Sequence, residues 1–256
     1  PHLDEAWKMK ICTLPIPEEW SKKSETLRSQ VEPYLQFLEK GGNIESTPEM
    51  RSILNFINQE NNIFHSHSYA QTKKLLAAKK KVITVGGDHS VSYGPIQAYV
   101  EKYPDLSILH FDAHADLREA YEGFDHSHAS IMFNVMKFNK IKKLVQVGIR
   151  DLSPNEISVI ESDDRIKTYF DWDLKNAFFE GRNWKQHCDE IISHLSSQVY
   201  ISFDIDGLDP KLCPNTGTPV PGGLEFGQAT YLIQQIRQSG RKIVGADLVE
   251  VAPGAT

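Results

Sequence analysis

Short apolar runs of strand-forming residues alternate along this chain with segments of helical periodicity. Such runs are typical of strands that are buried on both faces of a parallel sheet, and the helices between them provide the crossover connections. The alternation predicts a three-layer α/β/α fold with a mainly parallel, doubly wound sheet. The expected strands are residues 81–85, 106–111, 144–149, 167–170, 199–203 and 242–246. We expect the first of them, residues 81–85, to be buried.

Helix boundary signals support the same arrangement. Residues 92–103 have the length of a crossover helix and end before a proline. A capping box of Ser153 and Glu156, with proline at the first helical position, predicts a helix start. Residues 226–238 place apolar side chains on one face and are followed by Gly240, which predicts another helix.

The first 65 residues lack this alternation. Apolar stripes predict helices over 25–40 and 48–58, and two prolines indicate that residues 11–16 are extended without forming a central strand. No internal repeat and no linker rich in glycine or serine divides the sequence. We therefore expect one domain over residues 1–256, in which residues 1–65 form a mostly helical and irregular N-terminal part.

The composition disfavours several classes of partner. The chain has 256 residues, 40% of them hydrophobic, and a formal charge of −6 without a long block of like charge, so we expect neither nucleic acid nor membrane binding. Its three cysteines are far apart and lack the spacing of a disulfide framework or a thiolate zinc site. With no signal peptide and no apolar run long enough to span a bilayer, the sequence favours a cytoplasmic location.

Acidic and histidine residues gather where the predicted strands end. His89 follows the first strand, the segment Asp112-Ala113-His114-Ala115-Asp116 follows the second, and Asp204 and Asp206 follow the fifth. The carboxyl ends of parallel strands meet at one edge of a sheet, and a period of two lets alternate side chains face one way. Four carboxylates and two imidazoles in a low-dielectric pocket cannot all keep their charge state without a cation. The sequence therefore predicts a metal site.

The ligand types indicate the metal and its chemistry. Such a donor set is sufficient for two ions about 3.5–4 Å apart, joined by bridging carboxylates and a bridging water. Carboxylates with some imidazole and no thiolate suit manganese, with zinc, iron or cobalt as substitutes. Water bound between two ions loses a proton near neutral pH, so the expected cofactors are two Mn²⁺ ions and the expected reaction is hydrolysis.

Five motifs stand in a fixed order between about residues 82 and 253: Gly86-Gly87-Asp88-His89-Ser90, Phe111-Asp112-Ala113-His114-Ala115-Asp116, Ser202-Phe203-Asp204-Ile205-Asp206-Gly207-Leu208-Asp209-Pro210, Thr216-Gly217-Thr218-Pro219 and Asp247-Leu248-Val249-Glu250-Val251. Together they resemble the ureohydrolases, the family of arginase, agmatinase and formimidoylglutamase, and the agmatinase branch in particular. The resemblance implies an arginase-like fold with a binuclear manganese centre. The metal ligands that it implies are His89, Asp112, His114, Asp116, Asp204 and Asp206.

The resemblance also implies roles beyond the metal ligands. Glu250 matches the acid that pairs with the substrate guanidinium, which a carboxylate can hold through two hydrogen bonds, and Thr218 lies in a loop that lines the site. In the implied mechanism a bridging hydroxide attacks the guanidinium carbon, and a histidine protonates the departing amine. His128, in the segment Ser127-His128-Ala129, resembles the family's mobile histidine, and His126 stays open as the alternative.

The loop after Asp116 bears on the choice of substrate. In arginases the segment at this position contains an asparagine and binds the α-carboxylate and α-amine of arginine. In this chain the corresponding residues, 117–123, contain no asparagine. The resemblance therefore favours agmatine, hydrolysed to putrescine and urea in polyamine biosynthesis, with Glu122 or Asp125 receiving its terminal amine. Arg118 instead favours a substrate with a carboxylate, so arginine, a guanidino acid and formiminoglutamate stay open as alternatives.

Simpler explanations apply to some residues. We expect His110 to be a buried, hydrogen-bonded histidine, and His65 and His67 to form a solvated cap before a helix. Thr218 can also be explained as a residue that shapes a turn. A non-catalytic relative, in which a metal centre only stabilises a binding scaffold, is the alternative of another class. The resemblance further implies a homotrimer or homohexamer, and we expect the printed sequence to lack the family's terminal portions.

Overall fold

The computed structural model describes residue 8, residues 10–252 and residue 254, and it divides into two compact units at Ile57. The first unit contains α1 (Glu18–Glu39), the 3-10 helix η2 (Ile44–Ser46) and the start of α2 (Pro48–Ala77). Both helices predicted for this part are confirmed, and both are longer than predicted. The single domain over residues 1–256 stays a prediction.

The second unit begins inside α2, at Asn58. Because α2 continues to Ala77, His65 and His67 lie within a helix, and the prediction of a solvated cap before a helix is wrong. His65 is buried, since its ring packs against the rings of Tyr93 and His126. No glycine or proline interrupts residues 59–77, and this is the signal that could have shown that the helix continues.

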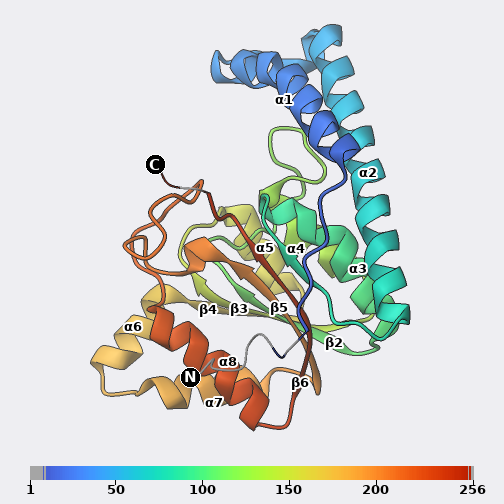
Figure 1. The fold of residues 1–256 in the computed structure, drawn as a ribbon. Coiled ribbons are helices and arrows are strands. Elements are labelled where there is room, and N and C mark those ends of the chain that lie inside the picture. The colour runs from blue at the N-terminus through green and yellow to red at the C-terminus, as the bar shows by residue number, and fades with distance from the viewer. Residues whose placement is uncertain (1–7, 9, 253, 255–256) are drawn as a thin grey trace. The chain divides into compact units, whose positions relative to one another are not determined.

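A six-stranded parallel sheet forms the centre of the second unit (Figure 1). Its strand order is β1-β6-β5-β2-β3-β4, and every neighbouring pair is parallel. The chain passes outward from β2 through β3 to β4, then returns to the other side of β2 with β5 and β6, so the predicted doubly wound topology is confirmed. The strands are β1 (Ile83–Val85), β2 (Leu106–Phe111), β3 (Ile141–Ile149), β4 (Ile166–Phe170), β5 (Gln198–Asp204) and β6 (Lys242–Val249).

Helices cover both faces of the sheet, as predicted for three layers (Figure 1). Successive residues of β2 point to opposite faces: Ile108 packs into the cluster with α3 (Tyr93–Lys102) and α4 (Ile131–Met136), and Leu109 into the cluster with α7 (Trp184–Ser193) and α8 (Phe226–Gln238). Burying such a side chain contributes about 1.5–3 kcal/mol. No helix in the described ranges is long and apolar enough to cross a bilayer. The helices are α3 (Tyr93–Lys102), α4 (Ile131–Met136) and α5 (Pro154–Ser162) on one face, and α6 (Asp171–Phe179), α7 (Trp184–Ser193) and α8 (Phe226–Gln238) on the other.

The first strand differs from its prediction. β1 pairs with β6 and lies at the edge of the sheet, where Ile83 is 65% and Val85 is 72% exposed. The expectation of a buried strand is therefore wrong for β1. An apolar run shows that a segment favours β structure, but it does not show whether the strand has a neighbour on each side and a helix over each face.

Candidate metal centre

The candidate metal centre lies at the carboxyl ends of β2 and β5, where the strand order reverses. The two strands run in register to their ends, so Asp112, which follows β2, and Asp204, which ends β5, are brought to the same edge. The chain then turns into the 3-10 helix η5 (Ile205–Gly207), which carries Asp206. This is the crevice in which open α/β sheets bind their ligands.

The segment from Asp112 to Asp116 delivers three side chains to the centre, but not as an extended strand. It lies beyond the end of β2, and Asp116 has a positive φ of 55°. The carbonyl of Asp116 accepts the backbone N–H groups of Met132 and Phe133, at 3.0 and 3.1 Å, at the start of α4. The expected alternation of a strand is therefore the wrong reason for the convergence, which comes from a chain that folds back toward the sheet.

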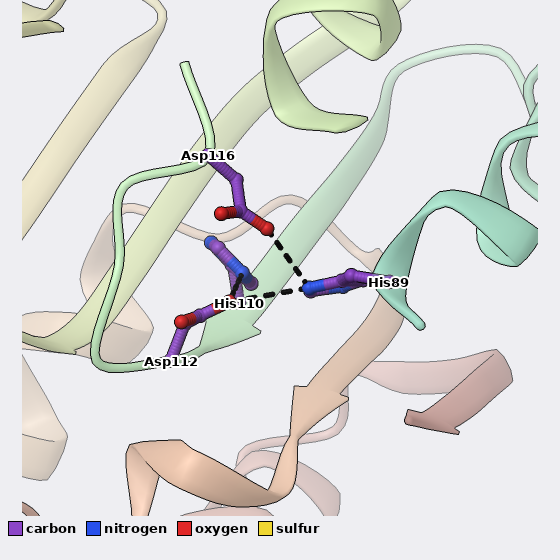
Figure 2. A group of neighbouring side chains, drawn as sticks. All are labelled: His89, His110, Asp112 and Asp116. Carbon is purple, nitrogen blue, oxygen red and sulfur yellow. Dashed lines mark hydrogen bonds and ion pairs between the residues drawn. The ribbon is translucent and has the colours of Figure 1, made fainter. Parts of the chain in front are cut away.

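His89 directs one ring nitrogen at three carboxylates. Its Nδ1 lies 3.0 Å from Oδ2 of Asp116, 3.2 Å from Oδ2 of Asp112 and 3.5 Å from Oδ2 of Asp204, and Figure 2 shows the first two contacts. The ring comes from the 3-10 helix η3 (His89–Ser92) beyond β1, and it is fully buried. Three carboxylate oxygens thus lie within 3.5 Å of one imidazole nitrogen.

The other ring nitrogen of His89 is held from within the sheet. The hydroxyl of Ser202 donates to Asp247 at 2.9 Å, so its oxygen accepts the Nε2 proton of His89 at 2.8 Å. This pair of bonds leaves the Nδ1 lone pair for the carboxylate side, as in many metal-binding histidines. Neither Ser202 nor Asp247 had a predicted role of its own; a polar residue inside an otherwise apolar strand is the signal that could have found them.

His114 faces the same shared carboxylate from the other side. Its Nδ1 lies 3.3 Å from Oδ1 of Asp112 and 3.1 Å from Oδ2 of Asp206. Asp112 therefore turns Oδ2 toward His89 and Oδ1 toward His114. The six predicted ligand residues are brought together as two adjacent groups that share Asp112: the first also contains His89, Asp116 and Asp204, and the second also contains His114 and Asp206.

His110 is a third histidine in contact with Asp112 (Figure 2). It is fully buried; its Nε2 lies 2.7 Å from Oδ2 of Asp112, and its Nδ1 lies 3.0 Å from Nε2 of Gln146. The prediction of a buried, hydrogen-bonded histidine is confirmed. The ring is near enough to be grouped with the metal ligands by distance, but both of its nitrogens already have hydrogen-bond partners.

Burial and crowding make these carboxylates hard to ionise together. Burial, followed by the charge of Asp112, raises the pKa of Asp116 to about 7, and the same two causes raise the pKa of Asp204 well above its ordinary value. Burial also tends to raise the pKa of Asp112, but the histidines around it, His110 first, hold that pKa well below the ordinary range. A divalent cation relieves this repulsion, and the mixture of carboxylate and imidazole donors fits manganese.

A cavity of about 230 Å³ opens beside this cluster. Its lining includes His114 and Asp116 from the two ligand groups, together with the predicted site residues His128 and Thr218. Thr218 is exposed, so it contributes to the rim of the cavity without being held in the core. A small molecule in this space would contact the metal ligands directly.

The two candidate proton-shuttle histidines take different positions. His128 begins the 3-10 helix η4 (His128–Ser130) and lines the cavity, and burial lowers its pKa below the ordinary value. His126 instead packs between the rings of His65 and Tyr93, with ring centroids 4.6 and 4.7 Å away. Of the two histidines, His128 is the one with access to the cavity.

Glu250 reaches the cluster from the end of β6. Its backbone has a positive φ of 61° and donates to the carbonyl of Gly87 at 3.0 Å, while its Oε1 accepts the backbone N–H of His89 at 2.9 Å. Burial raises the pKa of Glu250 to about 7. Glu250 lies outside the lining of the cavity, but a Cβ at Gly217 would be 3.8 Å from its Oε2, so the loop that carries Thr218 passes close to it.

Arg118 has a carboxylate partner in the cavity wall. Its Nε lies 3.5 Å from Oε2 of the buried Glu156, and its guanidinium lies over the ring of Tyr121, 5.1 Å from the centroid. Glu156 also accepts from the backbone of Leu117 at 3.1 Å and of Ser153 at 2.8 Å. The charge of Arg118 is therefore partly offset by Glu156.

A further acidic residue at the cavity was missed by the sequence analysis. Asp151 lines the cavity, its side chain is 63% exposed, and its carboxylate lies 3.9 Å from Nε2 of His114. Glu122 and Asp125, which were expected to receive a terminal amine, lie outside the lining. The position of Asp151, two residues after the end of β3, is the signal that could have found it.

Comparison with known proteins identifies the family. The model of the arginase family matches residues 17–255, and the chain belongs to this family, which confirms the resemblance to the ureohydrolases. It is 39% identical over 190 residues to N(1)-aminopropylagmatine ureohydrolase of Thermus thermophilus, and 35% identical over 202 residues to agmatinase of Halalkalibacterium halodurans. These alignments cover 73% and 78% of this chain but 61% and 65% of the relatives, so the chain spans less than two thirds of either.

A solved structure supports the fold assignment. Arginase from Bacillus subtilis superposes with a TM-score of 0.64 at 26% sequence identity, over 74% of this chain and 69% of that protein. The parallel sheet with helices on both faces is thus the arginase-like fold. The metal-centre residues lie on the edge of that sheet, in the part of the chain that the family model matches.

Proposed function

We propose that this chain is a manganese-dependent ureohydrolase that hydrolyses a guanidino substrate, and that this substrate is agmatine, which is cleaved to putrescine and urea. The observation that carries the proposal is the pair of ligand groups that share Asp112, set beside a cavity that His128 lines. Two relatives, one named as an agmatinase and one as an aminopropylagmatine ureohydrolase, support the reaction type.

The site residues would have three roles: metal binding, substrate binding and proton transfer. The six ligand residues would hold two Mn²⁺ ions, which supply a nucleophile by lowering the pKa of water to near neutral. Ionised above a pKa of about 7, Glu250 would pair with the planar guanidinium. His128 would protonate the departing amine, since it lines the cavity and an imidazole exchanges protons near neutral pH. Thr218 would line the substrate path.

The charges at the cavity favour a substrate with a cationic end. Arg118 is paired with the buried Glu156, which weakens its attraction for a substrate carboxylate. Asp151 keeps an exposed carboxylate at the cavity, where it can attract a terminal ammonium group. Agmatine carries such a group and has no carboxylate. Arginine, a guanidino acid and formiminoglutamate each carry a carboxylate that would meet the acidic wall.

A substrate panel with added Mn²⁺ tests the proposal. Agmatine, aminopropylagmatine, arginine, a guanidino acid and formiminoglutamate are compared for release of urea, ammonia and formamide. We expect urea and putrescine from agmatine, and loss of this activity on chelation and in Asp204→Asn. The exposed Asp105→Asn, which lies just before β2 and so at the opposite end of that strand from Asp112, should retain activity and serves as the matched control. Full activity of Asp204→Asn, or release of formamide in place of urea, would contradict the proposal.

A homotrimer or homohexamer in the cytoplasm, with a role in polyamine biosynthesis, belongs to the same proposal. Apolar side chains on α6 support an assembly: Trp172 is 73%, Phe178 is 57% and Phe179 is 80% exposed. Exposed aromatic side chains in such proximity are typical of surfaces that another molecule covers. Light scattering of the purified chain measures the number of copies.

A further inference from the structure

A row of polar side chains crosses the sheet beneath the candidate metal centre. Thr168 of β4, Gln146 of β3 and His110 of β2 are direct register partners on neighbouring strands. Both Gln146 and His110 are fully buried. Strands in the middle of a parallel sheet normally carry apolar residues at such positions, and buried polar groups are tolerated only when they are hydrogen-bonded.

The hydrogen bonds along this row have a fixed direction. The side-chain nitrogen of Gln146 lies 2.7 Å from the carbonyl oxygen of Ala115, and a carbonyl can only accept, so this atom is the amide NH₂ group. Its oxygen accepts the hydroxyl of Thr168 at 2.8 Å. Since the same NH₂ group lies 3.0 Å from Nδ1 of His110, that ring nitrogen must be the acceptor.

The ring of His110 therefore carries its proton on Nε2. This N–H points at Oδ2 of Asp112, 2.7 Å away, and in this tautomer Nε2 has no lone pair for a metal ion. The other oxygen of the same carboxylate, Oδ1, accepts the backbone N–H of His114 at 2.6 Å. One donor on each oxygen holds the plane of the carboxylate, with Oδ2 toward His89 and Oδ1 toward Nδ1 of His114.

We propose that His110, oriented by Gln146 and Thr168, is a positioning residue that fixes the carboxylate of Asp112 across the two ligand groups and thereby strengthens the binding of both metal ions. The inference rests on the proposed two-metal centre. His110 acts through Asp112 and touches neither substrate nor metal. A row of three side chains from three strands links the geometry of the centre to the register of the sheet.

Mn²⁺ binding to the metal-free chain tests the inference without any substrate. Calorimetric titration gives the affinity, and the electron paramagnetic resonance spectrum reports the arrangement of the two ions. His110→Phe keeps an aromatic ring but removes the donor, and Gln146→Met keeps the volume but no longer selects the tautomer. We expect each change to weaken Mn²⁺ binding about 10- to 100-fold and to alter the spectrum. His110→Gln, which restores an N–H donor, should recover part of the affinity.

Ser107→Ala is the matched control. Ser107 is also fully buried on β2, but its hydroxyl accepts the backbone N–H of Ser196 at 2.9 Å, at the opposite end of the strand. This variant should bind Mn²⁺ as the unaltered chain does. If His110→Phe does not fold, Gln146→Met and His110→Gln decide the question by the same two readouts.

Wild-type affinity and an unaltered spectrum in a folded His110→Phe or Gln146→Met chain would overturn the inference. So would an equal loss in Ser107→Ala, because the effect would then belong to general core disruption. Binding of Mn²⁺ without turnover of any substrate would defeat the proposed function but leave the positioning role measurable by binding. Absence of Mn²⁺ binding by the unaltered chain would overturn both.

Discussion

The surroundings of the histidine rings near the centre distinguish three tasks. His89 and His114 both turn Nδ1 toward carboxylates, as the proposed metal centre requires of its ligands. His110 has both nitrogens engaged in hydrogen bonds, and His128 lines the cavity. Residue type alone does not separate these tasks. The distinction comes from which neighbour can donate and which can only accept.

The choice between His128 and His126 gives a prediction at this scale. His128→Asn should lower kcat for agmatine by about 10²–10⁴, because a positioned acid that protonates the leaving amine contributes that much. His126→Asn should lower kcat far less, because His126 packs against His65 and Tyr93 outside the cavity lining. Steady-state kinetics at saturating Mn²⁺ measures both. A larger loss in the His126 variant would transfer the shuttle role to that residue.

At the scale of elements, η5 and the end of β2 must approach closely for the centre to form. A Cβ added to Gly207 would lie 2.6 Å from the backbone nitrogen of Asp112, and backbone cannot move aside as a flexible side chain can. The close approach lets Asp206 accept the backbone N–H of Ala113 at 3.0 Å. The two ligand groups therefore depend on a glycine at this position.

Gly207→Ala should weaken Mn²⁺ binding and lower the melting temperature, because the new methyl group pushes η5 away from β2. Overpacking of this kind typically costs about 1–3 kcal/mol. Calorimetric titration and thermal unfolding measure the two effects. Gly227→Ala is the control, since a Cβ there meets no atom within 4 Å, and it should be neutral or slightly stabilising. Equal behaviour of the two variants would contradict the close-approach argument.

Elements with complete local signals were predicted with the bounds that the structure gives. β2 spans 106–111 and α8 spans 226–238, as expected. α6 and α7 were not predicted individually, although a capping box of Asn183 and Gln186 marks the start of α7. The exposure of β1 could not be predicted, because the number of neighbours of a strand is decided by the topology and not by its own residues.

The candidate site was likewise predictable only in part. That its acidic and histidine residues come together could be predicted, because such residues at strand ends have no common structural explanation in such numbers. Its supporting residues could not. Gln146 and Ser202 are each a buried polar residue between apolar neighbours, and their partners come from the register of neighbouring strands. Register is a property of the folded sheet, so no spacing in the sequence reveals it.

At the scale of the whole molecule, metal binding is linked to both protonation and stability. Burial by itself lowers the pKa of His114, but hydrogen bonds to Asp112 and Asp206 outweigh it and raise that pKa to about 11. The metal-free chain therefore holds a proton on this ring at pH 8. Since a metal coordinates the neutral imidazole, binding must expel that proton, and the apparent affinity for Mn²⁺ should rise with pH.

Titration of the chelator-treated chain with Mn²⁺ at pH 8, in buffers of different ionisation enthalpy, should therefore show release of at least about one proton.

Mn²⁺ binding should also stabilise the folded chain. At about 100 times its Kd, a ligand stabilises the folded state by about 2.7 kcal/mol, which for a chain of this size corresponds to a rise in melting temperature of roughly 5–10 °C. Asp204→Asn should reduce this rise, because it removes a ligand from the group around His89. Proton uptake on binding, or a melting temperature indifferent to Mn²⁺, would show that the cluster is held by protons and is not a metal centre.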